Sequence, residues 1–224
     1  MASDNFSNLK KIIEKEKFDR VQGILFDLGF SSWHLEQSKK GFSFLKSEPL
    51  DMRYSPANPL TAEQIVNYWS LAEIARILTE YGQETFSQII AQKIIDYRKT
   101  RQIKTTDQLA KIIQNAVPQK RKRINAATQT FQALRIAVNG ELKNLQIALP
   151  QALDILVCGG RIAVISFHSL EDRIAKNFFK AKQKENLVNI LTKKVIRPER
   201  HEIIINPRSR SAVLRVVEKI CRTH

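Results

Sequence analysis

The chain has 224 residues, of which 37 are Lys or Arg and 22 are Asp or Glu, so its formal net charge at pH 7 is +15. A hydrophobic content of 43% with 26% charged residues is typical of a folded globular chain and argues against a disordered one. No apolar run is long enough to span a membrane, and the polar first residues predict no secretory signal. The two cysteines, Cys158 and Cys221, predict neither a disulfide framework nor a zinc site, which is typical of a reducing, cytoplasmic compartment.

The positive charge is distributed unevenly along the chain. Residues 181–224 hold eleven Lys and Arg against four Asp and Glu, and residues 120–123 form a separate basic block. An excess of this size usually marks a protein that binds a polyanion, most often a nucleic acid. The alternative is a solvated basic surface that keeps the protein soluble. The clustering favours a nucleic-acid partner.

The first sixty residues predict a helix, a strand and a long loop. Apolar residues at helical spacing predict a helix over residues 8–17. Residues 23–29 form a short apolar run, which is typical of a strand buried on both faces in a parallel sheet. Residues 30–60 have no clean period and contain three prolines, so we expect a loop, and long loops in compact domains are often functional.

The next part of the chain predicts a small lobe made only of helices. Thr61 and Ser70 each begin a capping box, in which a Ser or Thr is followed three residues later by Gln or Glu, so each starts a short helix. Apolar periodicity predicts two further helices, over residues 84–99 and 106–116. These four helices would form an insert after the first strand.

The remaining residues predict the back half of an open α/β sheet. The expected elements are a long helix (128–149), a strand (161–166), a helix (171–180) and two late strands (190–196 and 211–218). Pro150 should kink the long helix or restart it, because proline has no N–H to donate within a helix. The fold class is therefore α/β with an all-helical insert.

Polar side chains follow two of the predicted strands at their carboxyl ends. Asp27, Ser31 and Ser32 follow the first strand, and Ser166 and His168 follow the strand over residues 161–166. Ligands of open α/β sheets bind outside the carboxyl ends of the strands. These two segments are therefore the expected site of chemistry.

Each of these residues also has a structural interpretation. Asp27 can simply cap the turn after its strand, and loop serines such as Ser31 commonly have no catalytic role. A histidine at a strand end, such as His168, is often only hydrogen-bonded structure. A serine hydrolase is excluded because the sequence has no Gly-x-Ser-x-Gly elbow, and the four histidines are too scattered to suggest a metal site.

Two further groups of residues carry open alternatives. Arg208 and Arg210 lie two apart after Pro207, so they indicate either a phosphate contact or a solvated turn. The aromatic residues Phe30, Trp33, Phe42 and Phe44 can stack on a base or belong to the core.

Six segments, in this order, resemble the bacterial 16S rRNA cytosine-N4 methyltransferases, the ribosomal RNA small subunit methyltransferase H family. They are residues 23–32, 41–44, 49–53, 130–139, 159–173 and 206–212. The resemblance covers the chain from about Asp4 to Lys219. It implies a partial Rossmann-like S-adenosylmethionine methyltransferase domain, formed by residues 1–44 and 128–224, with an inserted helical domain at 45–127.

The resemblance also implies an activity and its site residues. The activity is transfer of a methyl group from S-adenosyl-L-methionine to the N4 amine of a cytosine in 16S rRNA of the small ribosomal subunit. Contacts to the cofactor fall on Phe6, Asp27 and His34, although the family usually has Gln at the last of these positions. The residues expected to bind RNA are Arg53, Lys120, Arg121, Lys122, Arg123, Arg135, Arg208 and Arg210.

The residues expected to be catalytic in such a reaction are Asp27, Ser31, Ser32 and His168, which follow the predicted strand ends. A cytosine amine is a poor nucleophile, so the site must orient it and accept hydrogen bonds from its N–H groups. Ser31 and Ser32 are candidate acceptors, and His168 is a candidate for taking the released proton. We expect no metal and no membrane, and a homodimer is a further expectation.

The sequence departs from the family at its start. The family has a glycine-rich cofactor loop that follows an earlier strand, and residues 1–224 contain no counterpart to it. No Gly-x-Gly-x-x-Gly follows any predicted strand. We therefore expect weak cofactor binding and no measurable methylation by these residues alone, with residues 23–28 as an exposed apolar edge strand. The alternative function is a non-catalytic RNA-binding remnant of the family.

Overall fold

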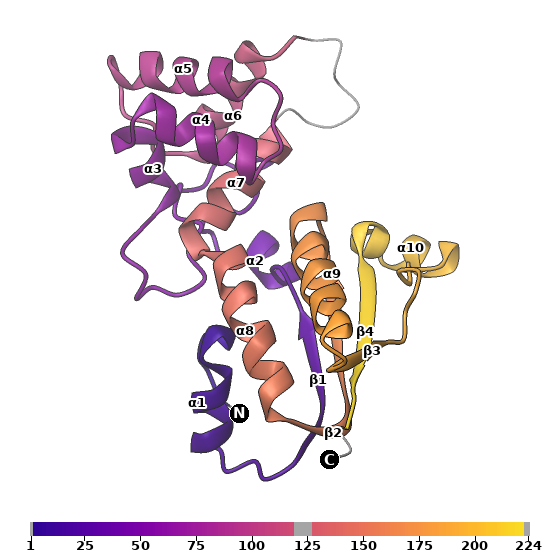
Figure 1. Cartoon of the computed structure of the whole chain (residues 1–224). Coiled ribbons are helices and arrows are strands. Elements are labelled where there is room, and N and C mark those ends of the chain that lie inside the picture. Colours follow the sequence, from indigo (N-terminus) through magenta and orange to yellow (C-terminus); the bar gives the residue numbers. More distant parts are fainter. Residues whose placement is uncertain (1, 119–126, 222–224) are drawn as a thin grey trace. The chain divides into compact units, whose positions relative to one another are not determined.

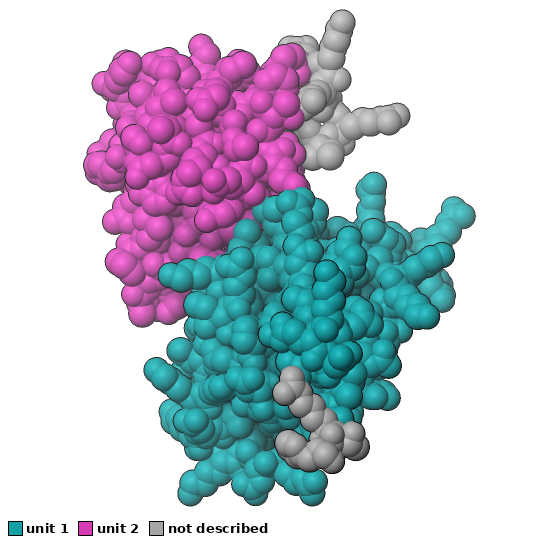
Figure 2. Space-filling view, viewed as in Figure 1, with its two compact units in different colours: residues 1–29, 142–224 teal, residues 30–141 magenta. Residues whose placement is uncertain are grey.

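The computed structural model in Figure 1 describes residues 2–118 and 127–221. The chain divides into two compact units, which Figure 2 shows in different colours. Unit 1 consists of residues 1–29 and 142–224, and unit 2 consists of residues 30–141. Unit 1 is thus built from both ends of the chain, and unit 2 from its continuous middle.

Unit 1 combines one mixed sheet with helices, as expected for a partial Rossmann-like domain. Its helical elements are η1 (Phe6–Asn8), α1 (Leu9–Lys15), α8 (Glu141–Ile155), α9 (Ser169–Lys184), α10 (Arg200–Ile205) and η3 (Pro207–Ser211). Its strands are β1 (Val21–Asp27), β2 (Leu156–Ser166), β3 (Val188–Ile190) and β4 (Val213–Lys219). The strand order is β1-β2-β4-β3, in which β1 and β2 are parallel and the other two pairings are antiparallel.

The core of unit 1 lies on one face of this sheet. Alternate strand residues, such as Phe26 of β1 and Val164 of β2, share this face because side chains alternate along a strand. They pack against apolar residues of α8 and α9, among them Leu149 and Phe179, so both helices cover the same face (Figure 1).

The first strand is buried on one face only, and the expectation of burial on both faces is wrong. Leu25, which points to the face opposite Phe26, is 62% exposed. In the part of the chain that the structure describes, β1 has a hydrogen-bonded neighbour on one side only, β2. Strand β1 is therefore an edge strand with an exposed apolar residue, as expected for residues 23–28.

Unit 2 is all helical in the described residues. Its helices are α2 (Ser32–Glu36), α3 (Ala62–Tyr68), α4 (Leu71–Glu80), α5 (Ser87–Arg98), α6 (Thr106–Ala116) and α7 (Ala127–Asn139). Both predicted capping boxes are confirmed, because Thr61 and Ser70 each accept a hydrogen bond from the backbone N–H three residues later. The helix α2 lies within the segment predicted to be a loop, where it spans only five residues.

The predicted long helix is broken at Gly140 rather than at Pro150. Gly140 has a φ of +61°, a left-handed conformation that glycine adopts without strain, and it separates α7 from α8. Pro150 lies within α8 and does not restart it. The break separates helices that pack into different cores, since α7 packs into unit 2 and α8 into unit 1.

The strand predicted over residues 190–196 is mostly absent. Strand β3 ends at Ile190, and beyond it Ile196 forms only an isolated bridge with Leu214. Pro198 follows, and proline cannot donate to a sheet ladder. The segment predicted as a polar loop before β4 contains the short helices α10 and η3.

The domain boundaries stay a prediction. The compact units change at residues 29/30 and 141/142, whereas the sequence places the helical insert at residues 45–127. The difference concerns residues 30–44 and 128–141, which pack within unit 2. In the described helices, none is long and apolar enough to cross a membrane.

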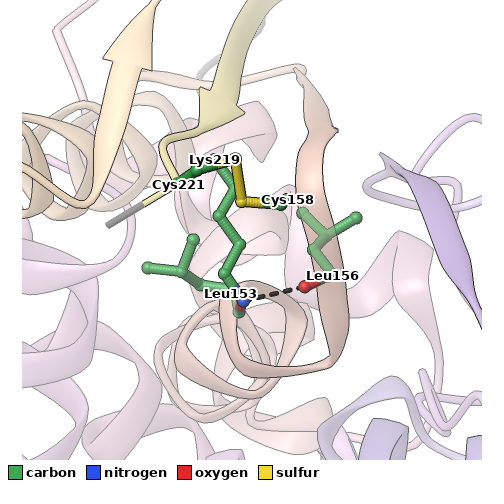
Figure 3. Close-up of a disulfide and its surroundings, with 5 residues drawn as sticks. All are labelled: Leu153, Leu156, Cys158, Lys219 and Cys221. Carbon is green, nitrogen blue, oxygen red and sulfur yellow. Dashed lines mark hydrogen bonds between the residues drawn. A yellow bond between two sulfur atoms is a disulfide. The ribbon is translucent and has the colours of Figure 1, made fainter. Parts of the chain in front are cut away.

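The two cysteines form a disulfide, so the expectation of no disulfide is wrong (Figure 3). Strands β2 and β4 are antiparallel, and the register that pairs Arg161 with Glu218 brings Cys158 opposite Cys221 when it is continued by three residues. Their Cα atoms are 5.2 Å apart, within the usual range for a disulfide. Sixty-three positions separate them in the sequence, so the pairing depends on the fold.

A lysine beside the disulfide closes the end of α8. The Lys219 Nζ donates to the backbone oxygens of Leu153 and Leu156, each at 2.8 Å (Figure 3). It also donates to the backbone oxygen of Asp154 at 3.3 Å. The last carbonyls of a helix have no partner within the helix, and a cation there also interacts favourably with the helix dipole.

We expect Lys219→Met to lower the free energy of unfolding by about 1–3 kcal/mol, because it leaves these carbonyls without their donor. Urea unfolding should show a lower midpoint. Lys193→Met, which changes an exposed lysine, is the matched control and should leave the midpoint nearly unchanged. Equal midpoints for both variants would show that the three hydrogen bonds contribute nothing to stability.

Candidate functional site

The carboxyl ends of β1 and β2 meet at one edge of the sheet in unit 1. Asp27 is the last residue of β1 and lies opposite Ile165, and the Leu28 N–H donates to the Ile165 oxygen at 3.1 Å. Ser166 ends β2 and is buried. Because the two strands are parallel and in this register, Asp27 and the segment leading to His168 lie at the same edge, as the sequence predicts.

The Asp27 carboxylate is exposed, and in residues 2–118 and 127–221 it makes no hydrogen bond or ion pair. The alternative role, a cap for the following turn, would need such a hydrogen bond. The chain turns instead at Gly29, whose φ of +91° favours glycine. Asp27 is thus available to a ligand.

His168 begins α9 as its N-cap. Its Nδ1 accepts a long hydrogen bond of 3.5 Å from the Glu171 N–H, and Glu171 Oε2 accepts from the Phe167 N–H at 2.9 Å. To accept this hydrogen bond, Nδ1 must be the ring nitrogen that carries no proton. Its lone pair is then already used in capping the helix. This geometry supports the structural interpretation of His168, and its catalytic role stays a prediction.

Phe6, the other predicted cofactor contact in unit 1 besides Asp27, is part of η1. Its ring packs edge-on against Phe26 with a centroid distance of 6.0 Å and an interplanar angle of 72°. Phe6 is half-buried against the core of the unit. It therefore lies beside β1, the strand that ends at Asp27.

The remaining predicted catalytic and cofactor-contact residues belong to unit 2. Ser31 is the N-cap of α2, and its Oγ lies 3.0 Å from Nδ1 of His34. Ser32 is the first residue of that helix. His34 is thus held at the start of a short helix by the serine that precedes it.

Aromatic rings surround His34 in unit 2. The rings of Phe30, Phe42 and Tyr54 form a stack, with centroid distances of 5.9 and 5.6 Å. The His34 ring packs edge-on against Phe42 and Tyr54, at 5.2 Å from each. The guanidinium of Arg135 lies over the Phe30 ring at 4.5 Å, a cation–π contact.

Of the aromatic residues that can either stack on a base or belong to the core, some rings fit one role and some the other. Phe42 is buried in the core of unit 2, and Phe44 packs against that core and contacts Phe131. Trp33 is 52% exposed, so its ring is available to stack on a base. Trp33 is therefore the better candidate for a base contact.

The pKa of His34 is lowered by burial among these rings and by the positive charge of Lys40. The unfolded chain therefore takes up a proton at higher pH than the folded protein does. The contribution of neutral His34 to the free energy of unfolding is fully present above the ordinary histidine pKa. It is lost as the pH falls through the lower pKa that His34 has in the folded protein.

We expect His34→Gln to flatten this pH dependence. The difference in free energy of unfolding between wild type and His34→Gln should change between about pH 7 and pH 5, with the wild type losing more stability. Urea unfolding over this pH range measures it, and all other titrating groups cancel in the difference. Parallel curves for the two proteins would show that His34 titrates normally.

The predicted RNA-binding arginines of unit 2 are engaged within the protein. Arg53 binds both carboxylate oxygens of Asp51, at 2.7 and 2.9 Å, and Arg135 binds both oxygens of Glu141, at 2.8 and 2.9 Å. Arg208 and Arg210 are exposed in η3 of unit 1. The basic block at residues 120–123 lies outside the described residues. All of these RNA contacts stay predictions.

Three residues of the aromatic and charged cluster were missed from the sequence: Tyr54, Asn139 and Glu141. The Tyr54 hydroxyl donates to Glu141 at 3.0 Å, and Glu141 holds Arg135. Asn139 also accepts from the Tyr54 N–H at 2.9 Å. The only sequence signal is local, since Arg135, Asn139 and Glu141 are close along the chain, whereas Tyr54 is distant in sequence.

A cavity of about 580 Å³ opens beside the disulfide of unit 1, near Gly159 and Cys221. Among the residues that the structure describes, no predicted site residue lines it. It lies at the end of β2 opposite to Ser166, away from the carboxyl ends of β1 and β2. The candidate site is therefore the edge of the sheet where β1 and β2 end, and not this cavity.

Comparison with known proteins gives relatives over nearly the whole chain. Ribosomal RNA small subunit methyltransferase H of Dehalococcoides mccartyi (strain ATCC BAA-2266 / KCTC 15142 / 195) is 46% identical over 235 residues, which cover 98% of this chain and 66% of that protein. The protein of the same name from Dictyoglomus thermophilum is 47% identical over 220 residues, 98% of this chain and 73% of that protein. The one from Ehrlichia canis is 44% identical over 225 residues, 97% of this chain and 76% of that protein.

The chain spans 66% to 76% of the length of these curated relatives. The model of the MraW methylase family matches residues 1–220. The family resemblance of the six separate segments is thus confirmed, and it extends over residues 1–220. This chain belongs to the MraW methylase family.

Proposed function

We propose that this chain takes part in S-adenosyl-L-methionine-dependent methylation of the N4 amine of a cytosine in 16S rRNA of the small ribosomal subunit. The observation that carries the proposal is Asp27, an exposed carboxylate without a partner in the described residues, at the carboxyl edge where β1 and β2 meet. Membership of a methylase family, the names of the relatives and the net charge of +15 support it.

The residues present fit part of the cofactor's requirements. The cofactor supplies an electrophilic methyl group on a positively charged sulfur. Asp27 can accept hydrogen bonds from cofactor hydroxyl or ammonium groups, and Phe6 provides an apolar surface beside β1. His34, which lies among aromatic rings and has a lowered pKa because of burial and the charge of Lys40, is a third candidate contact.

The chain's own residues would bind and orient the amine. Its N–H groups need acceptors, for which Ser31 and backbone oxygens after β1 are candidates, because acceptors hold the amine in line for transfer. The cytosine must leave its stack to reach any such site, and the exposed Trp33 ring can hold it there. The proton released on transfer passes to water, or to His168 once its Nδ1 leaves the cap of α9.

Partners and location follow from the same proposal. The substrate would be the small ribosomal subunit or its rRNA, which places the protein in the cytoplasm. A homodimer stays a prediction. Binding of RNA without methyl transfer is the alternative function, and the same experiment distinguishes the two.

Asp27→Asn tests the proposal in a protein that contains residues 1–224 together with a relative's glycine-rich cofactor segment, since we expect no measurable transfer by residues 1–224 alone; this protein without the substitution serves as the wild type. We expect the substitution to lower methyl transfer roughly ten- to a hundredfold, since it removes a charged cofactor contact worth about 1.5–3 kcal/mol, while changing the free energy of unfolding by less than about 0.5 kcal/mol. Incorporation of tritiated methyl groups into small ribosomal subunits measures transfer, and calorimetry measures cofactor binding. Asp19→Asn, which removes the same charge from an exposed residue, is the control.

The outcomes separate the interpretations. Transfer by wild type and by Asp19→Asn, but not by Asp27→Asn, supports the proposal. Equal transfer by Asp27→Asn would remove this residue from the site. RNA binding by the wild type with no transfer at saturating cofactor would favour the non-catalytic alternative.

A further inference from the structure

The outer surface of α9 in unit 1 carries a stripe of positive charge, made of Arg173, Lys176, Lys180 and Lys184, which we call the α9 stripe. All four are exposed. At 100° per residue they fall within an arc of roughly 80°, so they share one face of the helix. The apolar residues of α9, such as Ala175 and Phe179, are buried on the opposite side.

No acidic residue of the helix balances this stripe. Glu171 is buried at the helix start, where it accepts backbone hydrogen bonds, and Asp172 binds Arg215 through both carboxylate oxygens, at 2.6 and 3.0 Å. Lys182, the remaining cation of the helix, pairs with Glu185. In the described part of the chain, no ion pair involves any of the four stripe residues.

Helix stability does not account for the stripe. Cations near the end of a helix interact favourably with its dipole, which explains Lys182 and Lys184. Arg173 and Lys176 lie in the first half of α9, where the dipole gives no such benefit. Lys176, Lys180 and Lys184 are also spaced four apart, and like charges at this spacing repel and destabilise a helix.

We propose that the α9 stripe binds the phosphate backbone of RNA. The proposal rests on the proposed function for the identity of the polyanion. The helix rise places successive cations about 4.5–6 Å apart along the axis, so the stripe is a straight, regular row. Lysines bind phosphate as point charges, and the stripe face has no aromatic residue to stack on a base. The contact is therefore expected to be independent of base sequence.

The test uses the triple variant Lys176→Gln, Lys180→Gln and Lys184→Gln of the whole chain. The probe is a fluorescein-labelled oligouridylate, which contains no cytosine and so reports binding without methylation. With about 0.7 counterions released per phosphate contact on a single strand, the slope of log affinity against log salt should fall by about 2. Affinity near 0.1 M salt should fall roughly a hundredfold.

The matched control is Lys11→Gln, Lys15→Gln and Lys143→Gln, which removes the same charge from exposed positions outside α9. It should keep most of the wild-type salt slope. The stripe variant should be about as stable as the wild type in urea, because the like-charge repulsion that it removes offsets the lost interaction of Lys184 with the helix dipole. This excludes loss of binding through unfolding.

The test separates this inference from the proposed function. An unchanged salt slope in the stripe variant, or an equal loss in the control, overturns the inference even if methyl transfer is observed. Specific loss in the stripe variant supports it even if no transfer is found.

Discussion

Glu141→Ala is expected to lower the free energy of unfolding of the protein by about 3–5 kcal/mol. Only 12% of the Arg135 side chain and 10% of the Glu141 side chain are exposed, so removing the carboxylate leaves a guanidinium without its bidentate partner in a largely buried place. The Tyr54 hydroxyl loses an acceptor in the same variant. Urea unfolding followed by circular dichroism measures the effect.

The control for this prediction replaces both partners. The double variant Arg135→Met with Glu141→Leu has no unpaired charge, and replacing a buried ion pair by apolar residues is often neutral. It should therefore be clearly more stable than Glu141→Ala. Tyr54→Phe removes one hydrogen bond and should cost only about 1 kcal/mol. A Glu141→Ala protein as stable as the wild type would mean that water screens Arg135 effectively.

Reduction of the Cys158–Cys221 disulfide is expected to lower the free energy of unfolding by about 2–4 kcal/mol. The disulfide joins β2 to the end of β4 and closes a loop across 63 positions, which removes conformational freedom from the unfolded chain. Both cysteines are exposed, so a dithiol can reach them without unfolding the protein.

Urea unfolding with and without dithiothreitol measures this effect. The variant Cys158→Ser with Cys221→Ser should resemble the reduced wild type and should not respond to the reductant. Thiol titration of the native oxidised protein should find no free thiol among these two residues. Two titratable thiols under oxidising conditions would contradict the disulfide.

The local parts of the fold could be predicted from the sequence because their causes are local. Thr61 and Ser70 start helices through hydrogen bonds to residues three positions away, and both were identified. The apolar run that ends at Asp27 is a strand, and its end lies at the carboxyl edge of the sheet as predicted. The helix α2 was missed because five residues are too short to show a period.

The errors concern features that depend on distant residues. The helix break is at Gly140 because α7 and α8 pack into different cores, which periodicity alone does not reveal. Cys158 meets Cys221 only through the register of β2 and β4. The cation–π contact of Arg135 with Phe30 likewise joins residues that are distant in sequence, so the sequence gave no sign of it.

The division of unit 1 between the two ends of the chain has a consequence for the order of folding. Pairing of β1 with β2 must close a loop that contains all of unit 2, residues 30–141. Contacts between residues distant in sequence form slowly, because the entropy of loop closure is lost before the contacts are gained. Unit 2 is continuous and has its own core, so it can form first and bring residues 29 and 142 closer together. Formation of the helical insert then becomes a kinetic step on the way to the sheet.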